Sequence, residues 1–168
     1  MVPDFILHYL ECHQVPYSCH PHPRAVSAQQ LAASLHISGY RVVKAVLVEA
    51  QGRRYIAALP AAAMLDPLRF ADAVGATEAH LMREGDIEPL FPGCEVGAEP
   101  PFGALFGLPV VADRSLESDP RILCRAGSHE ETLALRFDDF RRLEHPLVAD
   151  IGVPFVARAE SASAELWE

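Results

Sequence analysis

Hydrophobic residues near the start of the chain recur with the spacing of two amphipathic helices. Pro3 suits a first helical turn, and residues 3–13 place four apolar side chains on one face: Phe5, Ile6, Tyr9 and Leu10. A second helix is predicted to begin at Ser27, which forms a capping-box pair with Gln30. Its apolar stripe ends before Gly39 and consists of Ala28, Leu31, Ala32 and Leu35.

The apolar runs that follow have the character of β-strands. Residues 42–49 and 55–59 are predicted strands, and residues 50–54 have the composition of a hairpin turn between them. After an ordered loop rich in proline and glycine over residues 91–107, strands are predicted again at residues 108–112, 122–125 and 133–137.

Start and stop signals define the remaining helices. Asp66 is a predicted N-cap, Pro67 occupies the first helical position, and Gly75 ends the helix. A short helix is predicted over residues 83–90, and another over residues 138–143 with its first residue as the cap. Helices and strands interleave irregularly, and the clearest strand pair is a hairpin. This order favours an α+β fold with a mixed sheet over a regular βαβ repeat.

A length of 168 residues suits one compact domain with a substantial core. We assign this domain to residues 1–150 and a C-terminal tail to residues 151–168. From residue 155 the tail is rich in Ala, Ser and Glu and carries Trp167, the only tryptophan. The sequence leaves open whether the tail forms a docked helix.

The charge balance restricts the kind of partner. A net charge of −9 argues against general, charge-driven binding of nucleic acid, although a local basic patch remains compatible with it. The candidates for such a patch lie in the N-terminal third: Arg24, Arg41, Arg53 and Arg54. No run approaches the roughly 20 apolar residues of a membrane span, and the N-terminus lacks a secretory signal. We expect a cytoplasmic protein.

The cysteines predict neither disulfides nor a metal centre. Cys12, Cys19, Cys94 and Cys124 show no paired C-x-x-C spacing. The segment that contains Cys12, His13, Cys19, His20 and His22 offers five ligand atoms, but its spacing matches no common zinc pattern. We therefore expect no metal and no cofactor.

Lys44 is the only lysine of the chain, against 13 arginines. It lies in an apolar run, flanked by valine and alanine, and the pKa of a lysine moves readily when the side chain is buried. Two interpretations compete. Lys44 either has a function, or it lays its stem on apolar surface and keeps its ammonium group in water.

Two further segments carry candidate chemistry. Residues 97–103 hold two glycines, two prolines and Phe102, and such a loop can aim backbone N–H groups at a carbonyl oxygen or serve as a structural turn. The segment from Ala126 to His129 closes a predicted strand. Ser128 and His129 look like a nucleophile beside its base, but neighbouring residues of a strand point to opposite faces and are not assumed to meet.

Taken in order, these pieces resemble the YbaK/ProX family, the free-standing relatives of the editing domain of bacterial prolyl-tRNA synthetases. The resemblance covers about residues 5–145. It rests on the motifs HPH at 20–22, SAQQLA at 27–32, RVVK at 41–44, LP at 59–60, FPGCEVG at 91–97, PPFG at 100–103, VVAD at 110–113 and AGSH at 126–129.

The resemblance implies a single compact α+β domain around a mixed, curved sheet, with flanking helices. It implies that Lys44 holds the acceptor end or the amino acid, that the loop from Gly97 to Pro101 binds the aminoacyl carbonyl, and that His129 lies near the pocket. The full implied substrate-binding set is Lys44, Gly97, Ala98, Pro101, Phe102, Gly103, Gly127, Ser128 and His129, with Lys44, Gly97 and His129 as its catalytic members. Ala45 departs from the polar residue that often follows the lysine.

The leading hypothesis is therefore a trans-editing hydrolase that cleaves the ester of mischarged aminoacyl-tRNA carrying a small amino acid. Its implied partner is the tRNA acceptor end, and neither a membrane nor DNA is expected as a partner. The sequence leaves open whether a synthetase or an elongation factor delivers the tRNA. The alternative is a non-catalytic module of the same fold that binds an aminoacyl group, tRNA or a synthetase. A Schiff-base enzyme built on Lys44 is a third possibility.

Overall fold

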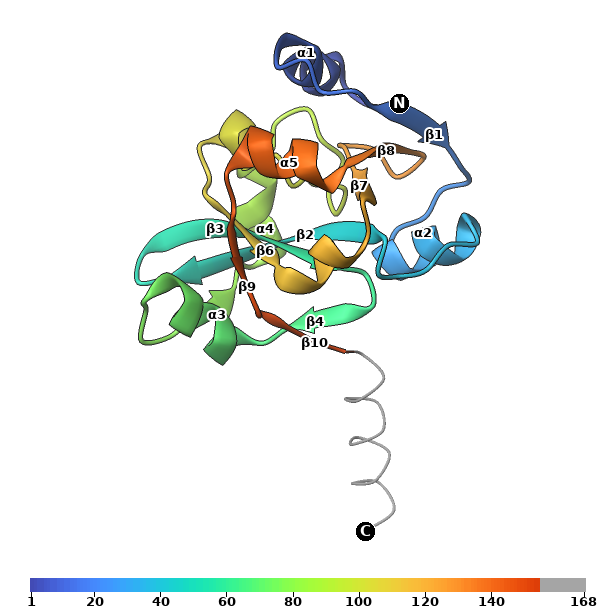
Figure 1. The fold of residues 1–168 in the computed structure, drawn as a ribbon. Helices are drawn as coiled ribbons and strands as arrows, with labels where there is room; N and C mark the ends of the chain where they lie inside the picture. The colour runs from blue at the N-terminus through green and yellow to red at the C-terminus, as the bar shows by residue number, and fades with distance from the viewer. Residues whose placement is uncertain (155–168) are drawn as a thin grey trace.

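A computed structural model describes residues 1–154 and has a curved, mixed sheet at its centre (Figure 1). The strand order is β1-β8-β7-β2-β3-β6-β9, and β5 pairs with β2 beside this path. The pairs β2·β7, β3·β6 and β6·β9 are parallel, and the other pairs are antiparallel. The strands are β1 Ser18–Pro21, β2 Val42–Ala50, β3 Arg53–Pro60, β5 His80–Leu81, β6 Val110–Asp113, β7 Arg121–Arg125, β8 Glu131–Arg136 and β9 Leu147–Ala149. This arrangement confirms the predicted α+β class.

The hairpin of β2 and β3 forms the spine of the sheet and confirms the predicted pair. Eight residue pairs connect the two strands, from Val43 opposite Pro60 to Ala50 opposite Arg53. Gln51 and Gly52 turn the chain with φ values of 49° and 76°, the two positive values that a type I′ turn requires.

Five α-helices flank the sheet: α1 Asp4–Cys12, α2 Ala28–Ser34, α3 Pro67–Val74, α4 Glu84–Ile87 and α5 Phe137–Glu144. Three 3-10 turns accompany them: η1 Glu88–Leu90, η2 Gly103–Phe106 and η3 Arg114–Ser118. The capping box at Ser27 and the Asp66 cap are both present as predicted. The last helix differs, because its N-cap is Arg136 and Asp138 lies inside its first turn, where a carboxylate favours the helix dipole.

The two faces of the sheet bury different side chains. On one face, α1 and α5 cover Val43 and Leu47 of β2, and on the other α3 covers Val48 (Figure 1). Helix α2 packs over Val42. Because residues alternate along a strand, Lys44 shares the face of Val42 and Val48.

A second, two-stranded sheet extends the domain beyond its predicted boundary at residue 150. Strand β10 Gly152–Pro154 pairs with β4 Ala63–Leu65, and Ile151 is completely buried. The sequence missed β1, β4, β5, β9 and β10, because strands of two to four residues show no periodicity and depend on a partner. The predicted tail from residue 155 lies outside the described residues. Within residues 1–154, every helix is too short or too polar to traverse a lipid bilayer.

Candidate functional site

Lys44 lies in the first half of β2, half-buried on the sheet face that α2 and α3 cover. Burial lowers the pKa of its ammonium group, because desolvation disfavours the charged form. Partial burial agrees with either interpretation of Lys44.

The register of the sheet brings Arg125 to the side of Lys44. Val42 lies opposite Leu123 and Val43 opposite Cys124 in the parallel pair β2·β7, so the next step aligns Lys44 with Arg125. Adjacent strands lie about 4.8 Å apart, and aligned residues point to the same face. The backbone register therefore aligns two cationic residues on adjacent strands and on one face of the sheet, 81 positions apart in sequence.

Arg125 is a candidate site residue that the sequence patterns did not indicate. Only 3% of its surface is exposed, and burial lowers the pKa of its guanidinium group while Glu99 and Glu95 raise it. Nη1 lies 2.8 Å from Nδ1 of His129, and Nη2 has no hydrogen-bond partner among the described residues. A buried donor without a partner is rare and costly, so it marks a candidate ligand contact. The feature of the sequence that could have pointed to Arg125 is the presence of an arginine at the end of an apolar strand.

Both ring nitrogens of His129 contact other groups of the protein. Nε2 lies 2.7 Å from the carbonyl oxygen of Val96 and donates to it. Nδ1 lies 2.8 Å from Nη1 of Arg125, which can only donate, and 3.3 Å from the carbonyl oxygen of Ala25. Both ring nitrogens are engaged within the protein. In this arrangement His129 positions Arg125 and offers no free lone pair as a base.

The predicted loop and the predicted turn lie against each other. The N–H of Glu95 donates to the carbonyl of Gly127 at 3.0 Å, and the N–H of Gly127 donates to the carbonyl of Ala98 at 2.8 Å. The Glu95 carboxylate also accepts from the N–H of His129 at 2.7 Å, which lowers the pKa of Glu95. Gly97 approaches His129 so closely that a Cβ would lie 3.4 Å from Cε1.

The first two N–H groups of the loop already have partners. Gly97 donates to the carboxylate of Glu99 at 2.9 Å, and Ala98 donates to the carbonyl of Glu95 at 3.0 Å. A carbonyl oxygen of a substrate reaches the Gly97 donor only if it displaces Glu99. The N–H of Gly97, which is the donor expected for the substrate carbonyl, is therefore already bonded to the Glu99 side chain of the same loop.

The end of the loop packs into the core of the protein, and the ligand contacts expected there stay a prediction. Phe102 is completely buried, with its ring 6.2 Å from that of Tyr9 and 6.3 Å from that of Phe140. Gly103 allows the chain to pass the Leu108 carbonyl, which a Cβ would strike. Pro101 is buried beside them.

Ser128 and Gly127 support the turn. The hydroxyl of Ser128 accepts from the N-terminal ammonium group and from the N–H of Glu130, both at 3.1 Å. It makes no pair with the His129 ring, whose nitrogens are engaged elsewhere. Gly127 has a φ of 81°, and a Cβ there would lie 3.0 Å from Cγ of Pro3.

The basic patch expected from the N-terminal arginines does not form as one unit. Arg24 lies 3.7 Å from Glu95, whereas Arg41 lies 3.2 Å from Asp119 beside the start of β2. Arg53 and Arg54 lie at the opposite end of this strand, past the hairpin turn. The strand separates the two groups by about 27 Å at 3.4 Å per residue.

The cysteines are all free, and Cys124 is buried, which raises the pKa of its thiol. Burial and the nearby Glu99 raise the pKa of Cys94 to about 11. Cys12 lies 3.3 Å from Nε2 of His8. Within residues 1–154, no group of three or more His, Cys, Asp or Glu side chains converges as a metal site.

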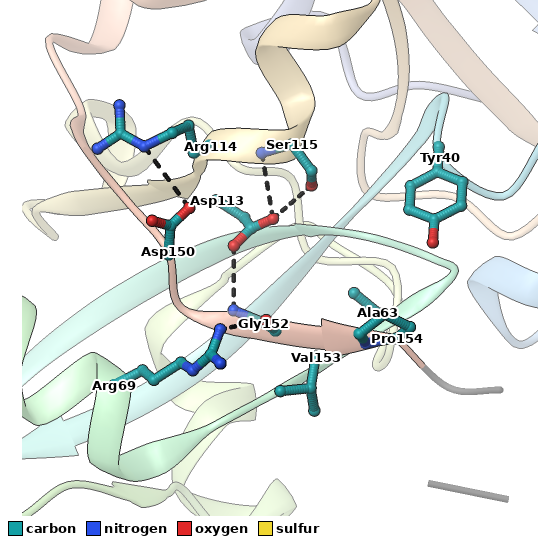
Figure 2. A pocket seen from close by; sticks show the side chains of 10 residues that line it. All are labelled: Tyr40, Ala63, Arg69, Asp113, Arg114, Ser115, Asp150, Gly152, Val153 and Pro154. Carbon is teal, nitrogen blue, oxygen red and sulfur yellow. Dashed lines mark hydrogen bonds and ion pairs between the residues drawn. The ribbon is translucent and has the colours of Figure 1, made fainter. Parts of the chain in front are cut away.

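A hollow of about 340 Å³ elsewhere contains strong but internally paired charges (Figure 2). Asp113 accepts there from the N–H groups of Ile151 and Gly152, both at 3.0 Å, and from Ser115. Arg114 pairs with Asp150 at 3.5 Å. These contacts fix the chain between β9 and β10.

The fold matches several solved structures at low sequence identity. A hypothetical protein designated APE2540 superposes with a TM-score of 0.80 at 20% identity, over 88% of this chain and 99% of that one. A candidate trans-editing enzyme for prolyl-tRNA synthetase gives 0.76 at 18% identity, over 88% and 94%. A candidate signal transduction protein from Marinobacter aquaeolei VT8 gives 0.71 at 20% identity, over 91% and 31%.

No curated protein matches the sequence. The family model of the aminoacyl-tRNA editing domain matches residues 22–143, a range that includes Lys44, the loop at Gly97, Arg125 and His129. The chain therefore belongs to the aminoacyl-tRNA editing domain family.

Proposed function

We propose that this protein is a trans-editing hydrolase that cleaves the ester bond of mischarged aminoacyl-tRNA carrying a small amino acid. The observation that carries the proposal is the pair of cations Lys44 and Arg125, which are aligned on adjacent strands beside the loop at Gly97, the first half-buried and the second buried. Two cations on one face suit a ligand that brings both a phosphodiester and a polarised carbonyl.

Lys44 binds the terminal phosphate or ribose in this proposal, as a point charge on a flexible stem. Arg125 donates from Nη2 to the ester carbonyl oxygen, the site where negative charge develops during hydrolysis. His129 positions Arg125 by accepting from Nη1. The substrate thus supplies the partner that Nη2 lacks in the protein.

Hydrolysis then needs little more than positioning, because an aminoacyl ester is already activated. Water adds to the carbonyl carbon, and the bond from that carbon to the ribose oxygen breaks. One proton of the water passes to the ribose oxygen, directly or through the vicinal ribose hydroxyl. The products are the free amino acid and tRNA with an intact terminal ribose.

A small amino acid as the substrate is taken from the family resemblance. Delivery by a synthetase or an elongation factor belongs to the same proposal. Such a partner compensates for the net charge of −9, which weakens unaided binding of tRNA.

One observation favours a second candidate function, a binding module without turnover. The N–H of Gly97 and both nitrogens of His129 have protein partners, so neither a ready oxyanion donor from Gly97 nor a free base from His129 faces the ligand. Binding of a non-hydrolysable aminoacyl-adenosine analogue, without hydrolysis of the matching ester, favours this module.

The decisive experiment measures deacylation of a panel of mischarged tRNAs by the wild type and by Lys44→Ala. We expect Lys44→Ala to lower kcat/KM by about 100-fold, since a hydrogen bond to a charged group contributes about 1.5–3 kcal/mol. Arg54→Gln serves as the matched control, because it removes one exposed positive charge at the far end of β2 and β3. Equal activity in wild type and Lys44→Ala removes Lys44 from the mechanism, and inactivity on every tRNA contradicts the hydrolase.

A further inference from the structure

Besides Lys44 and Arg125, further basic side chains lie on the same face of the sheet, near the edge formed by β1, β8 and β7. They line a groove of about 240 Å³, which we call the edge groove. Its lining combines apolar and basic side chains: His20, Leu35, Ile37, Arg41, Arg121, Leu123 and Ala134. His20 and Arg41 belong to the motifs at 20–22 and 41–44, but the site roles implied by the family resemblance include neither residue.

The basic side chains of the edge groove lie where their mutual repulsion destabilises the sheet. Arg121 lies directly opposite Arg136 in the antiparallel pair β7·β8, and like charges in this position destabilise a sheet. Arg41 and His20 add to the same end, while Asp119 is the acid that pairs with Arg41. A protein with a net charge of −9 thus gathers two arginines and a histidine around one hollow, with Arg136 on the strand beside them.

The shape and lining of the groove suit a nucleotide. Leu35 and Ile37 follow α2 and form an apolar wall, and the side chains of Leu123 and Ala134 form the floor. A nucleobase is flat and apolar on its faces, and arginine planes stack on it as well as bind its phosphate. The combination fits a nucleotide better than a purely apolar or purely acidic ligand.

The position of the groove links it to the proposed reaction site. Leu123 lies two residues before Arg125 on β7 and shares its face, a separation of about 6.6 Å along the strand. Across the strands, His20 lies opposite Thr132, which lies opposite Arg125. The groove therefore begins within the length of one nucleotide from Lys44 and Arg125.

We propose that the edge groove binds the single-stranded nucleotides that precede the terminal adenosine of the acceptor end. This inference rests on the proposed function, because it assumes that Lys44 and Arg125 hold the aminoacylated ribose. The groove then explains how an acidic protein contacts tRNA through one local basic surface. Bases pack against the apolar wall, and the arginines bind the phosphates.

The test uses Arg121→Glu in the full chain. This substitution places opposite charges across β7 and β8, so it is expected to fold normally. We expect KM for aminoacyl-tRNA to rise about tenfold with kcat within about twofold, as loss of one charged phosphate contact predicts. The corresponding aminoacyl-adenosine, which lacks the preceding nucleotides, should show unchanged kinetics.

A direct measurement separates the groove from the reaction. Fluorescence anisotropy of a labelled 5′-ACCA-3′ RNA should show about tenfold weaker binding to Arg121→Glu, and the dependence of binding on salt should fall by about one phosphate contact. Arg54→Glu makes the same charge change at the far end of the hairpin and should leave RNA binding nearly unchanged.

The outcomes distinguish the two proposals. Unaltered RNA binding by Arg121→Glu, with deacylation lost in Lys44→Ala, overturns the groove and leaves the hydrolase intact. RNA binding that falls in Arg121→Glu, without turnover of any tRNA by the wild type, supports the groove and contradicts the hydrolase. Displacement of the RNA by poly-glutamate of equal charge, as effectively as by unlabelled RNA, shows a general anion or acidic-peptide surface and overturns the nucleotide assignment.

Discussion

Two buried charged residues, Asp113 and Arg125, have opposite hydrogen-bonding situations. Asp113 is 6% exposed, and its two carboxylate oxygens accept from Ile151, Gly152 and Ser115. Figure 2 shows the bonds with Gly152 and Ser115. Arg125 is 3% exposed, and its Nη2 has no partner among residues 1–154. The carboxylate is satisfied by the fold, whereas the guanidinium group is only partly satisfied.

The difference separates structural charge from candidate functional charge. A hollow lined by charged groups, such as the one around Asp113, need not be a binding site when those groups neutralise one another. A buried donor without a partner costs the folded protein free energy, so a ligand that supplies the acceptor recovers it. This contrast is why we propose Arg125 and Lys44, rather than the hollow of Figure 2, as the reaction site.

The largest effect is expected for Asp113→Ala, which tests whether Asp113 has a structural role. Removing the carboxylate leaves the N–H groups of Ile151 and Gly152 without their acceptor, at about 1–3 kcal/mol each. We expect the free energy of unfolding to fall by about 4 kcal/mol, measured by urea denaturation. Deacylation per folded molecule should stay close to wild type, and a selective loss of activity would place Asp113 in the site.

The corresponding test of a functional role for Arg125 is Arg125→Met. We expect kcat/KM on a responsive aminoacyl-tRNA to fall about 100-fold, while the free energy of unfolding changes by less than about 1 kcal/mol, because an apolar replacement of similar length removes the unmet donor. Deacylation and urea denaturation of the same preparation check both. A large stability loss with normal activity would make Arg125 a structural residue like Asp113.

Lys44 provides a smaller test, since it is the only lysine and its acylation is readily localised by mass spectrometry. Burial lowers its pKa, so more of the amine is neutral and reactive at a given pH below the ordinary value of about 10.4. We expect the acylation rate of Lys44 to reach half its maximum below that value. Unfolding the protein in urea should raise this midpoint toward the ordinary value, because it removes the burial of the amine.

The smallest expected effect concerns Glu95, which accepts from the N–H of His129 and lies near Arg24. These contacts lower its pKa in the folded state, so its stabilising effect is complete above the unfolded pKa of about 4.3 and is lost as pH falls through the folded value. Glu95→Gln should therefore be less stable than wild type at pH 7 and converge with it below about pH 4. Urea denaturation at both pH values tests this, with the exposed Glu130→Gln as the control that should show no such convergence.

Local signals in the sequence predicted the elements that depend on nearby residues. The capping box of Ser27 and Gln30, the Asp66 cap and the hairpin between β2 and β3 all involve contacts within a few positions. Strand β9 escaped prediction because it has three residues and forms only against β6. The family resemblance also named the loop at Gly97 and the turn at His129, which do lie together.

The sequence by itself identified Lys44, because a single lysine among 13 arginines needs no structure to be noticed. Only the tertiary structure could show that Arg125 stands beside it, that His129 is engaged through both nitrogens, and that Phe102 belongs to the core. The physical reason is that these properties arise from strand register and burial. Both depend on chain segments many residues apart, and local patterns carry no record of which segments will meet.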